Sequence, residues 1–301
     1  MGKINNLAVV ILCGGASRRM GYPKALLPVG HESMVERVCR LAGEVSHEII
    51  IVTSPEQTLP QIPGNIRIIN DNQPFQGPLA AMGRGFPFID PTTEFAFVTA
   101  VDTPLLEPDI IRFLHSQIAE TDFDLIMPTD ESHFYPLASI YRVKPVHDEI
   151  QNLLGQNKFR PVFLMDQLKS IKINLETLQS IDPDLKTFQN INTRSEYRKF
   201  INEMNLELNQ WFKSKCVKVE FYGSSRRITG INACELECDF YHDLVTNLEL
   251  KFPDLSNRII FDGRLHRAFK LVRNSSEFID DFNDSPSDGD TIMLINADAG
   301  G

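Results

Sequence analysis

Short apolar runs that alternate with helix-like segments dominate the first half of the chain. The first run, LAVVILC at 7–13, is continuous and rich in β-branched residues, which is typical of a central parallel strand covered on both faces. Helix-like stretches such as 33–45 separate it from four later apolar runs, at 48–54, 65–71, 95–102 and 124–130. This alternation predicts βαβ units and a doubly wound, Rossmann-like α/β domain.

The pattern changes twice further along the chain. From about residue 145 it reads as mainly helical, and after a polar stretch containing Trp211 it becomes VKVEFYG, which alternates as a half-buried strand does. The later order of strand, strand, helix and strand is compatible with a small α+β ubiquitin-like (β-grasp) fold, and other α+β folds share it. We expect a first domain at 1–208, a linker at 209–215 and a second domain at 216–301.

Length and charge narrow the class of protein. A chain of 301 residues favours two domains. Its net charge of -10 argues against nucleic acid as a partner, because such binding needs a basic face. The apolar start is too short to span a bilayer and has no small-residue cleavage pattern, so we expect a cytoplasmic protein with no membrane partner. The five scattered cysteines predict free thiols.

A glycine-rich segment, LCGGASRRMGYPK, directly follows the first apolar run. Gly14 and Gly15 let backbone N–H groups approach phosphates closely, and such groups form an anion-binding concavity. Arg19 and Lys24 add charge-assisted hydrogen bonds to the β- and γ-phosphates. The alternative is an ordinary strand-to-helix turn with solvated cations. The segment is not a Walker A loop, because GK followed by Ser or Thr is absent.

Carboxylates at two other strand ends strengthen the phosphate interpretation. Asp102 ends the apolar run FAFVTAVD, and Asp71 ends another. The carboxyl edge is where open α/β sheets bind ligands, and a carboxylate there suits a Mg ion that bridges triphosphate oxygens.

At this point the chain resembles the molybdopterin guanylyltransferase family in five motifs that appear in the family's order. They are LCGGASRRMGYPK, Asp71 followed by GPL at 77–79, Asp102 followed by Pro104, YPLASIYR, and NINT at 190–193. The resemblance covers about residues 5–205. The resemblance implies that the base and phosphates are cradled by Leu12, Cys13, Gly14 and Gly15, and that Lys24 contacts phosphate. It also implies that Asp71 contacts the nucleoside and that Asp102 holds Mg. Finally, it implies that the pterin is placed by Asn190 and Asn192.

The residues leave the nucleotide open between GTP and CTP. Pro23 stands where the guanylyltransferases usually have Asp, as in the related cytidylyltransferases, and Tyr135 replaces the usual His of HPL. Gly14 and the NINT motif favour guanine, because the cytidylyltransferases usually carry Ala and DIDT there, and a glycine leaves more room for a purine. We therefore favour GTP as the substrate and keep CTP as the alternative.

The second region ends in ADAGG. Two residues without Cβ can thread a narrow channel to a partner enzyme, whereas a frayed terminus is the default for most chain ends. Residues 217–301, with Asp288-Gly289-Asp290 before an apolar run, resemble the sulfur-carrier family that includes the small subunit of molybdopterin synthase. The resemblance implies a thiocarboxylate on Gly301, after Gly300, formed by an adenylating enzyme and a sulfur donor. Because INADAGG replaces the usual proline-rich lead-in, the final partner can differ from the molybdopterin synthase large subunit.

Together these features predict a bifunctional protein of molybdenum cofactor biosynthesis. The first domain would transfer GMP from GTP to molybdopterin with Mg, through Arg19, Lys24 and Asp102, and the second would carry sulfur. One alternative is a sulfur-carrier or interaction protein whose first domain binds nucleotide without catalysis. Another is an active transferase that uses CTP or a non-pterin acceptor.

Overall fold

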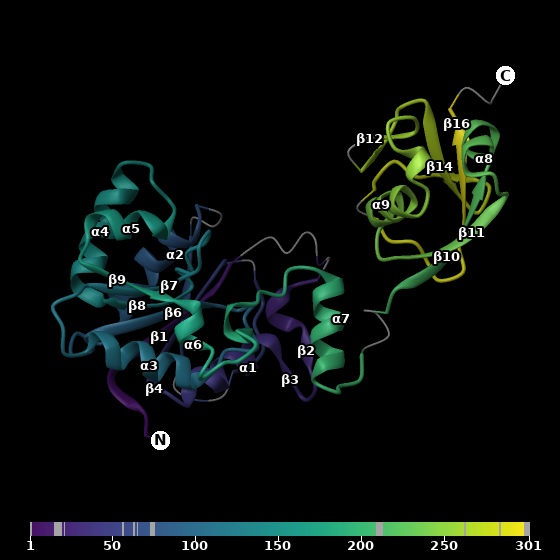
Figure 1. Cartoon of the computed structure of the whole chain (residues 1–301). Helices are drawn as coiled ribbons and strands as arrows, with labels where there is room; N and C mark the ends of the chain where they lie inside the picture. The colour runs from purple at the N-terminus through teal and green to yellow at the C-terminus, as the bar shows by residue number, and fades with distance from the viewer. Residues whose placement is uncertain are drawn as a thin grey trace. The chain divides into compact units, whose positions relative to one another are not determined.

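A computed structural model describes residues 2–297 except 15–19, 21, 56, 63, 65, 73–75, 209–212, 262 and 283. Of the predicted site residues, Gly15, Arg19, Gly300 and Gly301 therefore lie outside the described residues. The chain divides into two compact units, Met1–Glu207 and Leu208–Gly301 (Figure 1). None of the described helices is long and apolar enough to cross a bilayer.

The N-terminal unit is built on a sheet with the strand order β5-β4-β1-β6-β8-β7-β9 (Figure 1). Its strands are β1 (Ile4–Cys13), β4 (Ser46–Thr53), β5 (Ile66–Asn70), β6 (Phe95–Ala100), β7 (Leu125–Thr129), β8 (Ala138–Arg142) and β9 (Ser170–Asn174). Strand β8 is antiparallel to both of its neighbours, and the other adjacent strands are parallel. A separate small ribbon joins β2 (Pro28–Val29) to β3 (Glu32–Ser33).

Helices cover both faces of this sheet. Strand β1 shows why, because Val9 and Ile11 belong to one buried apolar cluster while Ala8 and Val10 belong to another. The first cluster packs under α1 (Met34–Gly43), α3 (Pro108–Ile118) and α6 (Leu175–Leu178). The second packs under α2 (Pro78–Gly85), α4 (Val143–Gly155) and α5 (Leu164–Gln167). The predicted doubly wound α/β fold of the first domain is confirmed.

Local sequence signals start the helices that frame the site. Helix α1 begins with a capping box between Ser33 and Glu36, and α7 (Arg194–Glu203) begins with one between Thr193 and Glu196. Proline occupies the first turn of α2 and α3, where its missing N–H costs nothing. Short 3-10 turns complete the unit: η1 (Lys24–Leu26), η2 (Phe86–Phe88), η3 (Pro161–Phe163) and η4 (Lys186–Phe188).

Two strands differ from the sequence prediction, which treated the chain after about residue 145 as helical and took YPLASIYR only as a motif. Strand β8 lies inside that motif, and β9 follows a region, 160–169, that contains only η3 and the four-residue α5. Strand β9 lies at the sheet edge, so its residues are at most half-buried. An edge strand lacks the continuous apolar run that marked the central strands.

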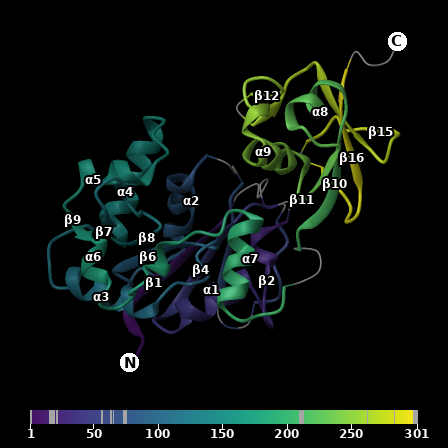
Figure 2. The ribbon, with the colours of Figure 1, turned by 45° about the vertical axis from the view of Figure 1, so that its right-hand side comes forward.

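The C-terminal unit holds a mixed sheet in the order β11-β10-β16-β14-β15. Its elements are β10 (Lys215–Phe221), α8 (Gly223–Thr229), β11 (Ala233–Cys238), α9 (Tyr241–Lys251), η6 (Pro253–Leu255), β12 (Ile260–Phe261), β13 (Arg264–Leu265), β14 (Phe269–Arg273), β15 (Glu277–Phe278) and β16 (Thr291–Asn296). The first strand, β10, pairs in parallel with the last, β16, and the remaining pairs of this sheet are antiparallel. Helix α9 lies on one face of the sheet (Figure 2). Its Leu244 and Leu248 belong to the buried apolar cluster of this unit. The five cysteines of the whole chain are free.

Candidate functional site

A cleft of about 380 Å³ opens at the carboxyl ends of β1, β4, β5 and β6. The topology explains its position, because the chain leaves β1 toward β4 and β5 on one side and reaches β6 on the other. Ligands bind in open α/β sheets at such a switch point. Of the predicted site residues, those that line the cleft are Leu12, Gly14, Asp71, Asp102 and Asn190.

Cys13, the remaining described member of the predicted LCGG cradle, points elsewhere. Its side chain is buried among the apolar residues on one face of the sheet. Burial, the largest contribution, raises the pKa of the Cys13 thiol to about 12. Its sulfur accepts a hydrogen bond from the Gln57 side chain at 3.5 Å. The Cys13 thiol therefore belongs to the core, and Cys13 is not among the residues that line the cleft.

Lys24, Asp102 and Asn192 come together from three distant parts of the sequence. The Lys24 ammonium donates to Oδ2 of Asp102 at 2.8 Å and to Oδ1 of Asn192 at 2.6 Å. The backbone N–H of Ile191 donates to the carbonyl of Asp102 at 2.8 Å, which holds the NINT segment against the end of β6. The structure thus joins a predicted phosphate ligand, a predicted metal ligand and a predicted pterin ligand in one polar cluster.

The second oxygen of Asp102 is arranged differently. Oδ1 is buried and, among the residues that the structure describes, has no hydrogen-bond partner. A buried carboxylate oxygen without a partner is costly. The described residues contain no group of three or more His, Cys, Asp or Glu side chains suited to a metal. Mg²⁺ at nucleotide sites needs only one or two carboxylates besides phosphate oxygens and waters, so Asp102 fits such an ion.

Asp71 forms an ion pair that the sequence did not suggest. Nε of Arg84, on α2, lies 2.5 Å from Oδ1 of Asp71, and the Asp71 carboxylate is largely buried. The Asp71 backbone N–H donates to the carbonyl of Thr53 at 2.7 Å, which ties the end of β5 to the end of β4. Arg84 follows the GPL motif by five residues, and that spacing alone does not indicate a partner.

A second basic residue missed by the sequence argument is Arg194, which follows NINT directly. Its side chain is buried, and its Nε donates to the carbonyl of Met20 at 3.1 Å. Met20 is itself fully buried near the end of the glycine-rich segment. Arg194 thereby connects the start of α7 to the loop that carries the predicted phosphate ligands.

Tyr135, which stands in place of the family's usual histidine, lies in the loop before β8. Its hydroxyl donates to Oδ2 of Asp130 at 2.7 Å, and its ring meets the ring of Phe188 edge to face. Burial and then the bond to Asp130 raise the pKa of Tyr135 to about 12. The nearby Leu137 lines the cleft. Tyr135 thus acts as a neutral hydrogen-bond donor that shapes this loop.

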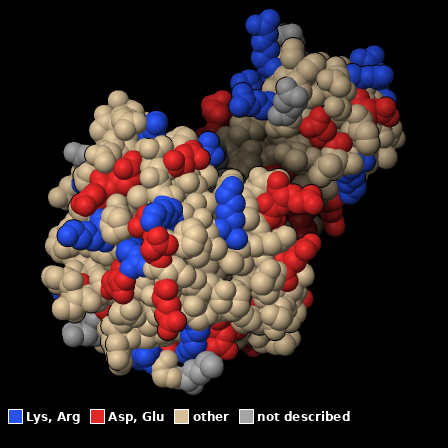
Figure 3. Space-filling view, turned by 60° about the vertical axis from the view of Figure 1, so that its left-hand side comes forward, with Lys and Arg blue, Asp and Glu red and all other residues tan. Residues whose placement is uncertain are grey.

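The visible face of the N-terminal unit carries no broad basic patch (Figure 3). On the face turned to the viewer in Figure 3, basic side chains of the N-terminal unit are interspersed with acidic ones. This pattern agrees with the negative net charge of the chain. Phosphate binding would therefore depend on the local cluster of Lys24 and the loop, and not on a broad basic field.

A doubly wound sheet, with a glycine-bearing strand end and strand-end carboxylates around one cleft, defines a nucleotide-binding α/β domain of the nucleotidyltransferase class. The family model of the MobA-like NTP transferase domain matches residues 9–170. The chain belongs to this family.

Similar proteins agree with that assignment. A protein of Mycobacterium tuberculosis (strain H37Rv) named "probable molybdenum cofactor guanylyltransferase" is 34% identical over 170 residues, which are 56% of this chain and 83% of that protein. A protein of the same name from Mycobacterium avium (strain 104) is 34% identical over 195 residues, 64% of this chain and 93% of its own length. The protein is thus a nucleotidyltransferase similar to the molybdenum cofactor guanylyltransferases.

A solved structure supports the fold of the matched part. Molybdopterin-guanine dinucleotide biosynthesis protein A from Archaeoglobus fulgidus superimposes with a TM-score of 0.55 at 19% identity and covers 66% of this chain and 98% of its own. At this identity the likeness concerns the fold alone.

Proposed function

We propose that the N-terminal unit transfers GMP from Mg-bound GTP to a terminal phosphate of molybdopterin. The observation that carries the proposal is the Lys24–Asp102–Asn192 cluster, whose Asp102 lines the cleft and keeps its buried Oδ1 available for a cation. An oxygen of the acceptor phosphate attacks the α-phosphorus of GTP and forms the new P–O bond. The bond from the α-phosphorus to the bridging oxygen breaks, and pyrophosphate leaves.

The residues of the chain have separate tasks in this reaction. Asp102 would hold Mg²⁺, which when bound neutralises charge on the phosphate oxygens. Lys24 donates hydrogen bonds to the departing pyrophosphate, where negative charge builds up. Asn192 keeps the Lys24 ammonium directed toward this point, because its amide oxygen accepts at 2.6 Å. No protein nucleophile is needed, since the acceptor supplies its own phosphate oxygen.

Gly14 supports guanine as the base. It lines the cleft, and a Cβ built on it meets no atom of the described chain within 4 Å. Among the described residues, no side chain or backbone fills the place of this Cβ, so we assign that space to the ligand. The two guanylyltransferase-named relatives favour the same base.

Product analysis tests the proposal. Purified protein, Mg²⁺ and molybdopterin are incubated with GTP or with CTP, and the dinucleotide product and pyrophosphate are measured. We expect a guanine dinucleotide product. The rate of its formation should fall by at least about a hundredfold in Asp102→Asn, because an amide is a weaker metal ligand than a carboxylate. Asp109→Asn, on the exposed start of α3, is the control and should behave as the parent. A faster reaction with CTP, or full activity of Asp102→Asn, contradicts the proposal.

We also propose that the C-terminal unit is a ubiquitin-like sulfur carrier. Its sheet places the first and last strands side by side in parallel, with α9 packed on one face, as a β-grasp fold requires. Gly300 and Gly301 follow β16 in the sequence. The Gly301 carboxylate would attack ATP on a separate adenylating enzyme, with loss of pyrophosphate. The outer sulfur of a donor persulfide would then displace AMP to form an acyl disulfide. A second thiol would cleave the S–S bond of that acyl disulfide, which leaves the thiocarboxylate on Gly301 and a new disulfide between the two thiols.

Intact-protein mass spectrometry tests the carrier proposal. After incubation with a sulfur-carrier adenylating enzyme, ATP and a sulfur donor, the mass should increase by the difference between one sulfur and one oxygen atom. Deletion of Gly301 should prevent this increase. An equal increase in the deleted protein would show that the modification lies elsewhere and would remove Gly301 from the mechanism.

A further inference from the structure

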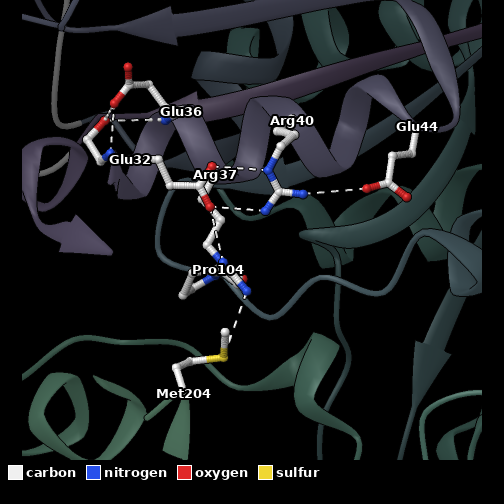
Figure 4. A network of polar contacts seen from close by, with 8 residues as sticks. Glu32, Glu36, Arg37, Arg40, Glu44, Pro104 and Met204 are labelled. Atoms are coloured by element: carbon white, nitrogen blue, oxygen red, sulfur yellow. Dashed lines mark hydrogen bonds and ion pairs between the residues drawn. The ribbon is translucent and has the colours of Figure 1, made fainter. Parts of the chain in front are cut away.

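Arg37, on the face of α1 next to the site, contacts three separate segments of the chain (Figure 4). Its Nε donates to the carbonyl of Pro104 at 2.7 Å, and one terminal nitrogen pairs with Glu32 at 3.1 Å. Its other terminal nitrogen lies 3.9 Å from the sulfur of Met204, just after α7. The Arg37 side chain is only 15% exposed. A largely buried guanidinium thus joins α1, the turn after β6 and the end of α7.

The turn that Arg37 holds carries the proposed metal ligand. Pro104 lies two residues after Asp102, and the carbonyl of Asp102 accepts the N–H of Ile191. Inside the turn, the Thr103 hydroxyl donates to the carbonyl of Ala100 at 2.8 Å. The backbone around Asp102 is therefore fastened by Ile191 and by Arg37. Both contacts lead to α7, because Ile191 precedes that helix and the Arg37 guanidinium lies 6.0 Å from the ring of Phe200.

We propose that Arg37 is a positioning residue for the Asp102 carboxylate, and that it sets the affinity of the site for the metal without touching metal or nucleotide. The inference rests on the proposed function, in which Asp102 holds Mg²⁺. A planar guanidinium can donate in several fixed directions at once, whereas a lysine ammonium is a point charge that cannot reproduce the fork. Small displacements of a catalytic group cost large factors in rate, so fixing this turn matters.

Arg40 offers a matched control on the same helix. It binds both carboxylate oxygens of Glu32 at 3.0–3.1 Å and lies 3.5 Å from Glu44, but its polar contacts with the described residues do not reach the turn after β6 (Figure 4). Its hydrogen bond is the largest influence that holds the pKa of Glu32 below the ordinary value. Replacing Arg40 therefore disturbs the shared Glu32 partner and leaves the Arg37–Pro104 contact in place.

The experiment measures Mg²⁺ binding by isothermal titration calorimetry, and initial rates of nucleotide transfer against Mg²⁺ concentration, for the full chain, Arg37→Gln, Arg37→Lys and Arg40→Gln. Both Arg37 variants should raise the half-saturating Mg²⁺ concentration by about tenfold, with little change in the GTP KM at saturating Mg²⁺. Arg40→Gln should stay within about twofold of the parent, as expected for an exposed pair.

Partial unfolding of a variant is distinguished from this effect, because a smaller folded fraction lowers the maximal rate and leaves the half-saturating Mg²⁺ concentration unchanged. Unchanged Mg²⁺ curves in both Arg37 variants, or an equal shift in Arg40→Gln, would overturn the positioning role. Asp102→Asn, run in parallel, separates this failure from a failure of the proposed function. If Asp102→Asn keeps the parent's Mg²⁺ dependence, the metal assignment itself is wrong.

Discussion

At the scale of single residues, Gly77 shows why one amino acid is required beside the cleft. It precedes α2 with φ 100° and ψ 170°, a conformation that is essentially restricted to glycine. A Cβ built on it would lie 3.1 Å from the carbonyl oxygen of Phe159. Gly77 and Pro78 both line the cleft, so a shift of the backbone here would change the lining of the cleft.

We predict that Gly77→Ala lowers the free energy of unfolding by about 1–3 kcal/mol. It should also raise the KM for the nucleotide, because the start of α2 must move. Gly155→Ala is the control, since Gly155 ends α4 without a left-handed φ and its Cβ would meet no described atom within 4 Å. Chemical denaturation and steady-state kinetics of both variants check the prediction. Equal stability of the two variants would contradict it.

At the scale of elements, the turn directly before β16 depends on a buried carboxylate. Asp290 is 7% exposed and accepts hydrogen bonds from the Ser287 N–H at 2.7 Å and the Asn274 side chain at 2.9 Å, and it lies 2.6 Å from Nε of Arg273. Burial by itself raises the pKa of Asp290, but these hydrogen bonds and the Arg273 charge outweigh it and hold the pKa below its ordinary value. The ionised form is thus favoured in the folded unit.

The lowered pKa sets the sign of a pH effect. The ionised Asp290 stabilises the folded unit in full when the pH is above the pKa of an aspartate in the unfolded chain. This stabilisation is lost as the pH falls through the lower pKa that Asp290 has in the folded unit. We predict that Asp290→Asn lowers the stability of the C-terminal unit by about 2 kcal/mol at neutral pH. The difference from the parent should shrink below about pH 4. Denaturation from pH 7 to pH 2.5 measures it, with the exposed Asp280→Asn as control; a difference independent of pH would refute the prediction.

At the scale of the whole molecule, the two units have separate cores. The buried clusters on the two faces of the first sheet contain no residue beyond Leu178, and the cluster around Leu244 and Leu271 contains only residues from Val217 onward. Units with separate cores respond to substitutions nearly independently. Deletion of Gly301 should therefore leave nucleotide transfer unchanged, and Asp102→Asn should leave thiocarboxylate formation unchanged. Loss of both activities from either change would show that the proposed functions are coupled.

Sequence by itself predicted the doubly wound sheet and the edge at which its cleft lies. Continuous apolar runs mark strands that are buried on both faces, and a residue directly after such a run, such as Asp71, must lie at the carboxyl edge of the sheet. Leu12, Gly14, Asp71 and Asp102 line one cleft for this reason, whereas Asn190, which follows the turn η4, was predicted only from the family resemblance. An apolar run and the residue that follows it are only a few positions apart, so both can be identified in the sequence without knowledge of the tertiary structure.

Tertiary structure alone decided the direction of β8, the edge strand β9 and the residues that support the site. The direction of β8 depends on which strands lie beside it, and β9 is too exposed to carry a strong apolar pattern. Arg37, Arg84 and Arg194 resemble ordinary surface cations in the sequence. Packing brings them to Pro104, Asp71 and Met20, and such contacts between distant segments follow from the assembled fold and not from local spacing.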